Sequence, residues 1–252
     1  MFIDTHAHLY YVDLKNQLDD VIRRAAEADV VQIICVGTDL ESSRESIAIA
    51  EKYSNVFATV GVHPHDANDA SSDFIEEIRE LAKHTKVVAI GEMGLDFYRN
   101  LSPPEMQRTV FRQQLELAEE LELPAVIHNR EAHEALLTIL EEIMPRRGVV
   151  HCFSSDVETA KEILNLGLKI SFTGTITFVK NNSDSVLKYI NLDDFMLETD
   201  CPFLAPVPNR GKLNEPANIM HIARRVAEIK GVSIKEVAEN TSRNAQTFFS
   251  LP

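Results

Sequence analysis

The first residues of the chain, MFIDTHAHLYY, place an aspartate and two histidines at every second position: Asp4, His6 and His8. Alternate side chains of a β-strand point to the same face, so these three would form one row. Imidazole and carboxylate groups are common ligands of divalent metal ions. The stretch therefore predicts a first strand that presents candidate metal ligands on one face.

More residues of the same chemical types lie at or just after the ends of later apolar segments. They are His63, His65, Glu92, His128, His151 and Asp200. A single strand histidine is as well explained by a satisfied core or loop position. Ligand-type residues at equivalent positions on several different segments instead favour one shared site.

The segments that carry these residues alternate with amphipathic ones. Eight short β-branched or aliphatic runs are predicted as strands, at 2–8, 30–37, 56–63, 87–94, 124–129, 148–153, 168–174 and 194–200. Helical periodicity is found at 13–28, 41–53, 73–84, 104–121, 131–143, 156–166, 181–190, 216–229 and 233–249. This α/β pattern predicts a TIM-type (β/α)8 barrel with an extra C-terminal helix; a doubly wound open sheet is the main alternative.

In such a barrel the carboxyl ends of all strands converge on the face where active sites form. We therefore predict one metal site made of His6, His8, Glu92, His128, His151 and Asp200. Six donors exceed the needs of one tetrahedral ion with an open position, whereas two divalent ions sharing a bridging carboxylate use them all. The donors suit Mg, Mn, Zn, Co or Ni, and do not distinguish among them.

The alternation of side chains also predicts neighbours of the ligands. Arg130, Phe153 and Glu198 lie two positions from a ligand and share its face. Arg130 could meet a substrate phosphate, Phe153 could stack on a base, and Glu198 could support a ligand from behind. Local packing or a strand-end ion pair is an equally good explanation for each. The same alternation turns Cys152 and Cys201 toward the helical layer, as core residues.

Length and composition are consistent with one barrel domain spanning 1–252, with 28.3 kDa and 44% hydrophobic residues. The net charge of −14 argues against an extended basic groove for nucleic acid, but not against a local grip on one phosphate. No long apolar run or leader-like start is seen, so we expect a cytoplasmic protein without a membrane span. No obligate protein partner is evident, and the scattered cysteines indicate neither disulfides nor a structural zinc site.

Seven motifs in order resemble those of the TatD family of metal-dependent deoxyribonucleases, within the amidohydrolase-like barrels. They are DTHAHL (4–9), GVHPH (61–65), GEMGLDFY (91–98), IHNREA (127–132), HCFS (151–154), LETDCPFLAP (197–206) and RGKLNEP (210–216). The resemblance spans nearly the whole chain. It implies a TIM-type barrel, a divalent metal site and hydrolysis of DNA, typically as a 3'-to-5' exonuclease.

The resemblance also implies how the ligands are divided. His6, His8, Glu92 and Asp200 would hold one metal ion, and Glu92, His128 and His151 the other. The departures from the family pattern fall at non-ligand positions: Met93, Asn129 and Cys201. Many amidohydrolases bridge two metals with a carboxylated lysine on the fourth strand, but no lysine lies between Val87 and Tyr98. A glutamate bridge instead resembles the phosphodiesterase and nuclease side of that superfamily.

We expect the following roles in such a site. Asp200 would be the general base for a metal-bound water, and Glu92 would position the metals. Asp4 would orient the free N–H of a ligand histidine. Further residues would contact substrate, although a loop-structuring pair or solvated charges would also explain them: His63, His65, Arg210 and Lys212.

Two other functions remain compatible with the sequence. A metal-activated hydroxide would also cleave another ester or amide, such as aminoacyl-tRNA, and the fold alone does not choose between substrates. A non-catalytic metal-binding or scaffold protein would require a degraded ligand set, and none of the six ligands is missing.

Overall fold

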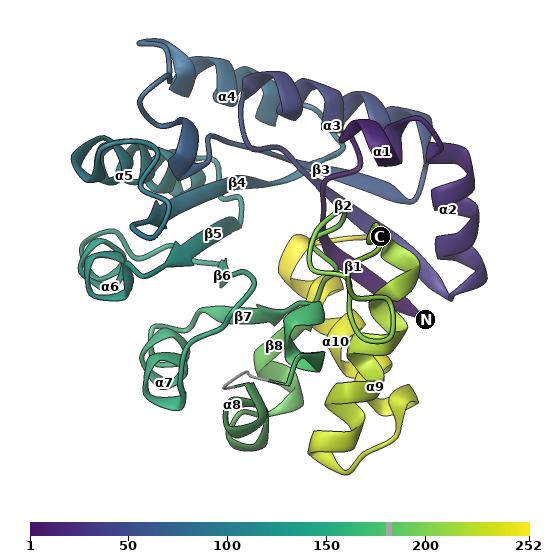
Figure 1. The fold of residues 1–252 in the computed structure, drawn as a ribbon. Helices are drawn as coiled ribbons and strands as arrows, with labels where there is room; N and C mark the ends of the chain where they lie inside the picture. Colours follow the sequence, from purple (N-terminus) through teal and green to yellow (C-terminus); the bar gives the residue numbers. More distant parts are fainter. Residues whose placement is uncertain (180–182) are drawn as a thin grey trace.

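A ring of eight parallel strands forms the centre of the computed structural model, which describes residues 1–179 and 183–252 (Figure 1). Each strand pairs with the next one in the chain, in the order β1 to β8. The strands are β1 (Phe2–Ala7), β2 (Val30–Val36), β3 (Val56–Val60), β4 (Val87–Asp96), β5 (Ala125–Arg130), β6 (Gly148–Val150), β7 (Lys169–Phe172) and β8 (Phe195–Leu197). The predicted TIM-type (β/α)8 barrel is confirmed.

The first and last strands close the barrel through the residues that follow β8. The amide of Asp200 donates to the carbonyl of His6 (2.8 Å), and the amide of His8 donates to the carbonyl of Cys201 (2.7 Å). A single parallel bridge joins Ala7 and Cys201. Closure therefore depends on the same segments that carry three of the predicted ligands.

Helices surround the strands on the outside of the ring (Figure 1). They are α1 (Val12–Lys15), α2 (Leu18–Glu27), α3 (Leu40–Lys52), α4 (Phe74–Ala82), α5 (Pro104–Glu120), α6 (His133–Glu142), α7 (Val157–Asn165), α8 (Ser183–Tyr189), α9 (Ile219–Lys230) and α10 (Ile234–Phe249). The predicted helix at 13–28 is divided into two helices, α1 and α2. The predicted helix at 181–190 is described from Ser183 onward, because positions 181 and 182 lie outside the described residues. The extra C-terminal helix is α10.

Local chemistry explains where several helices begin and end. The side chains of Asp39, Asp156 and Ser233 each accept a hydrogen bond from a backbone amide in the first turn of α3, α7 and α10, respectively. Helix α9 ends at Gly231, whose φ of 69° lies in the left-handed region that glycine adopts without strain. These signals position the helices independently of the site.

The inside of the barrel is apolar toward the amino-terminal ends of the strands. Residues from seven strands pack there against the last turns of α10, which contacts both β1 and β8. The cluster consists of Ile3, Ile34, Val36, Phe57, Val88, Ala89, Val126, Val149, Met196, Ala245, Phe248 and Phe249. Helix α10 therefore closes this end of the barrel.

Strand β1 departs from the strict alternation expected of it. Its register against β2 shifts between Phe2 and Ile3 and again between Asp4 and Ala7. The predicted row of Asp4, His6 and His8 on the inner face would turn Ile3 toward the helices, but Ile3 is part of the interior apolar cluster. No helix in the described part of the chain is both long enough and apolar enough to cross a membrane.

Candidate metal centre

The six predicted ligands meet at the carboxyl-terminal ends of the strands. His6 lies in β1, Glu92 in β4 and His128 in β5. The other three, His8, His151 and Asp200, follow β1, β6 and β8 directly in the loops. Five strands therefore contribute to one cluster, which faces a cavity of about 650 Å³.

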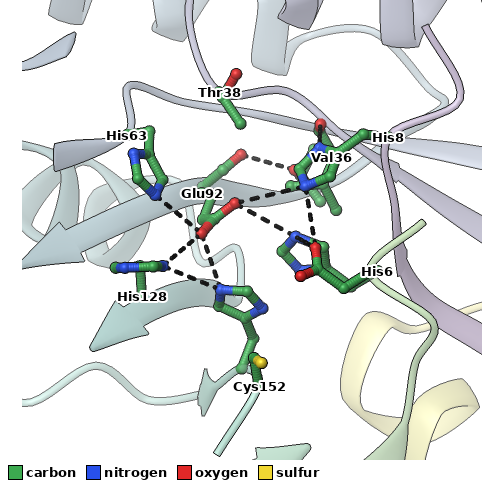
Figure 2. Close-up of polar contacts among 12 residues, drawn as sticks. His6, His8, Val36, Thr38, His63, Glu92, His128 and Cys152 are labelled. Carbon is green, nitrogen blue, oxygen red and sulfur yellow. Dashed lines mark hydrogen bonds and ion pairs between the residues drawn. The ribbon is translucent and has the colours of Figure 1, made fainter. Parts of the chain in front are cut away.

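The Glu92 carboxylate is the centre of the cluster (Figure 2). Its Oε1 lies 2.8 Å from Nε2 of His151, 2.9 Å from Nδ1 of His128 and 3.3 Å from Nε2 of His63. Its Oε2 instead faces His6 Nε2, at 3.3 Å. The two oxygens therefore point at two different groups of histidines.

Asp200 completes the second of these groups. Its Oδ1 lies 3.3 Å from Nε2 of His8 and 3.8 Å from Nε2 of His6. Three sets of donor atoms are each compact enough to hold a metal ion: His6, Glu92 and His151; His6, His8 and Asp200; and His63, Glu92 and His128. His63, predicted as a substrate contact, thus lies as close to the Glu92 carboxylate as the predicted ligand His6 does.

His6 supplies direct physical support for a bound cation. Both of its ring nitrogens are buried, and neither makes a hydrogen bond of acceptable geometry. Its ring stacks on that of His151, with centroids 4.0 Å apart. Burial, together with the neighbouring His151, lowers the pKa of His6, which favours the neutral ring with one nitrogen lone pair available to a cation. A buried unpaired imidazole is costly unless it binds a ligand, so these residues fit a metal ion.

The carboxylates of the cluster stay ionised despite their burial. Burial raises the pKa of Glu92, but the charges of His151 and His63 outweigh it and hold this pKa well below its ordinary value. Burial likewise opposes the ionisation of Asp200, and its hydrogen bond with His8 lowers the pKa overall. Two anionic carboxylates together with several imidazole side chains form a donor set suited to divalent cations.

Hydrogen bonds behind the rings fix which nitrogen faces the cluster. The carbonyl of Val36 lies 3.0 Å from Nδ1 of His8, which leaves Nε2 for the cluster. His128 is turned the other way, because its Nε2 lies 3.2 Å from Oδ2 of Asp96 and its Nδ1 faces Glu92. Such partners orient metal ligands and fix their tautomers.

Asp96 is a site residue that our sequence analysis missed. Its Oδ2 also lies 2.8 Å from Nε2 of His65, and its Oδ1 accepts a hydrogen bond from the amide of Arg99 (2.7 Å). Burial opposes its ionisation, but the hydrogen bonds from His128, Arg99 and His65 lower the pKa of this carboxyl. The one signal in the sequence was the spacing: Asp96 lies four positions after Glu92 and shares its face, because β4 extends to Asp96.

Asp4 supports the site differently from the role we predicted. Its Oδ1 accepts from the amides of Thr199 (2.9 Å) and His6 (3.3 Å), and its Oδ2 accepts from Oγ1 of Thr199 (2.6 Å). Burial raises the pKa of Asp4 to about 7 against these hydrogen bonds. Asp4 therefore ties the backbone of β1 to the segment before Asp200, and does not orient a ring N–H.

Glu198 lies directly behind His151, in the supporting position predicted for it, although β8 ends one residue before it. Its Oε1 is 3.5 Å from Nδ1 of that histidine and accepts a hydrogen bond from the amide of Cys152 (2.7 Å). Its Oε2 accepts from the hydroxyl of Ser171 (2.7 Å). The carboxylate thus joins the loop after β6 to strand β7.

The prediction for position 152 needs correction. Strand β6 ends at Val150, and Cys152 has a left-handed backbone with φ of 49°, so the period-two alternation does not extend past His151. Cys152 is half-buried and lines the site cavity instead of packing in the helical layer. Phe153 is buried and packs edge-on against Phe172, which fits the local-packing alternative. It also borders a second cavity beside the site, so its contact with a base stays a prediction.

The remaining predicted substrate contacts divide into two groups. His63, His65 and Arg130 line the site cavity. Arg210 is not among the described residues that line it; its guanidinium lies 4.3 Å over the ring of Phe178. The phosphate contact predicted for Arg210 stays a prediction.

The fold and the cluster together define a metal-binding (β/α)8 barrel. The family model of TatD-related DNases matches residues 3–250. A Bacillus subtilis protein named as the uncharacterized metal-dependent hydrolase YabD is 42% identical over 255 residues, covering 100% of both chains. The 3'-5' ssDNA/RNA exonuclease TatD of Erwinia amylovora is 37% identical over 257 residues, covering 98% of this chain and 99% of that one.

The solved structures lead to the same family. The crystal structure of YJJV, a TatD homologue from Escherichia coli, superposes with a TM-score of 0.95 at 32% identity, covering 100% of this chain and 98% of that one. The chain belongs to the family of TatD-related DNases, which confirms the resemblance seen in its motifs.

Proposed function

We propose that this protein is a metal-dependent nuclease that hydrolyses phosphodiester bonds of DNA and removes nucleotides from the 3' end of a strand. The observation that carries the proposal is the arrangement of Glu92, which directs one carboxylate oxygen to His128 and His151 and the other to His6. The name of the Erwinia amylovora relative, a 3'-5' ssDNA/RNA exonuclease, supports this substrate and direction.

The ligands would hold two divalent ions in two groups. His6, His8 and Asp200 would bind one ion, His128 and His151 the other, and Glu92 would contribute an oxygen to each. Ions bound there would polarise the phosphoryl oxygens and lower the pKa of water. His63, with its Nε2 3.3 Å from Glu92, is a further candidate for the second group.

Asp200 is the residue we assign to proton transfer. Its side chain is 14% exposed, against 4% for Glu92, so it borders the cavity and can reach a water that attacks the phosphorus. The lowered pKa keeps it a carboxylate that can accept that proton.

The backbone at this position also indicates a functional constraint. Asp200 has a φ of 55°, a conformation that costs a non-glycine residue free energy. Two hydrogen bonds hold it there, from its amide to the carbonyl of His6 (2.8 Å) and from the amide of Phe203 to its carbonyl (2.9 Å). The carboxylate is thereby fixed next to His8.

Digestion of end-labelled single- and double-stranded oligonucleotides, with divalent metal or with EDTA, tests the proposal. We expect shortening from the 3' end that requires metal and is lost in His128→Ala. A matched control is His84→Ala, because His84 precedes β4 at the amino-terminal end of the barrel and pairs with Glu51 (3.1 Å) away from the cluster. Calorimetric metal titration of both variants separates loss of the ions from loss of the fold.

A substrate panel distinguishes this proposal from other hydrolase functions. It compares DNA, RNA, aminoacyl-tRNA and simple esters under identical metal conditions. Faster hydrolysis of aminoacyl-tRNA or an ester than of any oligonucleotide would overturn the nuclease assignment. Metal binding with no hydrolysis of any substrate would favour a non-catalytic role.

A further inference from the structure

Two exposed aromatic side chains lie at one end of the site cavity. Tyr11 is 39% exposed and Phe203 is 45% exposed, and both line the cavity. Their rings meet edge-on, with centroids 5.2 Å apart, and each lies about 6 Å from the ring of His8. Large aromatic groups exposed to water at a cavity wall are available to bind a flat apolar partner. This aromatic wall adjoins the His8 and Asp200 end of the cluster.

Two cationic side chains lie at the opposite end of the cluster. The amide of Arg99 bonds to Asp96, and Arg130 follows His128 by two positions on β5; both arginines line the cavity. Neither forms an ion pair with a carboxylate anywhere in residues 1–179 or 183–252, although the chain carries 39 acidic residues. The guanidinium of Arg130 instead lies 4.1 Å from the centroid of the Tyr98 ring. We call this pair of arginines the cationic wall.

A second cavity of about 620 Å³ extends the site on the cationic side only. It shares Asn129, Arg130 and Ser154 with the site cavity. Its own lining adds the donors Arg108 and Ser155 and the carboxylates Glu131 and Glu134. The residues of the aromatic wall do not border it. A chain-like substrate therefore has room to continue past Arg130.

We propose that the site binds an unpaired 3' end in one fixed direction, with the terminal base on the Tyr11 and Phe203 wall and the preceding phosphate at Arg99 and Arg130. This inference rests on the proposed nuclease function and adds to it the residues that bind the terminal base and those that bind the preceding phosphate. The terminal nucleotide leaves from the aromatic end, and the rest of the strand runs through the second cavity.

The chemistry of the two walls explains this division. Aromatic side chains bind the faces of bases that are not stacked in a duplex, largely regardless of sequence. Arginines with no carboxylate partner can turn their donors to a phosphate without first breaking an ion pair. Binding of a duplex end would require the terminal base to unpair before it could reach Phe203.

Three single-stranded oligonucleotides and two variants test the direction of binding. One oligonucleotide is unmodified, one has an abasic 3'-terminal nucleotide, and one has an uncharged methylphosphonate in place of the phosphate 5' of the scissile one. The variants are Phe203→Ala and Arg130→Gln. Matched controls are Tyr189→Ala and Arg23→Gln, an exposed aromatic and an exposed arginine on α8 and α2.

In the wild-type enzyme, the abasic terminus should raise KM by roughly 5- to 100-fold, the usual range for loss of one stacked base. Phe203→Ala should raise KM for the unmodified strand and reduce this abasic penalty to within about two-fold. The methylphosphonate penalty, of about ten-fold, should disappear only in Arg130→Gln. Both control variants should keep both penalties.

Each contrary result has a distinct meaning. If the abasic penalty persists in Phe203→Ala, or the methylphosphonate penalty persists in Arg130→Gln, the proposed direction is wrong while the nuclease function stands. If Phe203→Ala instead removed the methylphosphonate penalty and Arg130→Gln removed the abasic penalty, the strand would run in the opposite direction. Failure of the wild-type enzyme to cut any oligonucleotide with metal present would overturn the nuclease function itself.

Discussion

The two ends of the barrel are built from the same strands but differ in chemistry. On β5, Val126 packs in the apolar interior toward α10, and His128 two positions later belongs to the metal centre. The segment formed by β6 and the residue after it repeats the pattern, with Val149 in the apolar interior and His151 in the cluster. At these two positions, period-two alternation places one residue in the packing and the residue two positions later in the candidate metal centre. Substitutions at the two ends should therefore separate stability from turnover.

The largest effect is expected at the chemical end, for Glu92→Gln. The amide keeps the size of the side chain but removes the charge that faces His6 on one side and His151 on the other. We expect kcat to fall by about 1000-fold or more, because several kcal/mol of metal-based stabilisation would be lost. Steady-state kinetics measures the loss of kcat, and calorimetric metal titration measures the loss of metal affinity. Retention of more than about a tenth of the activity with unchanged metal affinity would contradict a central role.

The opposite result is expected at the packing end, for Phe248→Ala. Phe248 is 4% exposed and its ring meets that of Phe249 edge-on where α10 closes the barrel. Removal of a buried ring of this kind costs about 3 kcal/mol of unfolding free energy. Denaturant unfolding should show this loss, while kcat per folded molecule stays unchanged. A matching loss of kcat would show that the two ends are not independent.

Asp96→Asn examines a residue that supports the chemistry without being a ligand. Asp96 needs an acceptor at Oδ1 for the Arg99 amide and an acceptor at Oδ2 for His128 and His65. Asparagine provides only one acceptor oxygen, so one of these contacts must be lost. We expect metal affinity or activity to fall by about 10- to 100-fold, as for other residues that orient a ligand histidine. A loss of stability with normal metal affinity would assign Asp96 a structural role only.

The sequence predicts the parts of the molecule that periodicity and chemistry specify together. Apolar strands with ligand-type residues at their ends give both the barrel and the six clustered residues. Asp96 was missed because the fourth strand runs two residues further than its apolar pattern indicates. The placement of Cys152 failed for the opposite reason, since β6 ends early and this residue turns the chain with a left-handed backbone.

Loop residues further from the strand ends were not predicted from the sequence. Tyr11, Arg99 and Phe203 reach the cavity from loops after β1, β4 and β8. No repeat relates their positions to those of the ligands, because loop conformation depends on local contacts and not on strand periodicity. Phe203, for example, is held near His8 by the hydrogen bond from its amide to the carbonyl of Asp200. Such residues became visible only with the three-dimensional structure.

The smallest effect is expected in the salt dependence of binding, which reports how many phosphates of the substrate the protein neutralises. Each phosphate neutralised on a single strand contributes about −0.7 to the slope of log K against log salt. With Arg99 and Arg130 as the cationic contacts, we expect a slope of about −1.4, which Arg130→Gln should reduce to about −0.7. Fluorescence anisotropy of a labelled strand with metal present measures this slope. The measurement uses the Asp200→Asn variant, which should cleave the strand slowly.

The charge of the rest of the molecule also predicts that few phosphates are contacted. The net charge of −14 repels a polyanion outside the site, so few counterions should be released on binding. Arg23→Gln in the same background should leave the slope unchanged, because Arg23 pairs with Asp20 and Glu27 on α2. A slope near −4 would report about six neutralised phosphates, and would mean that the strand follows a longer basic path than the cationic wall provides.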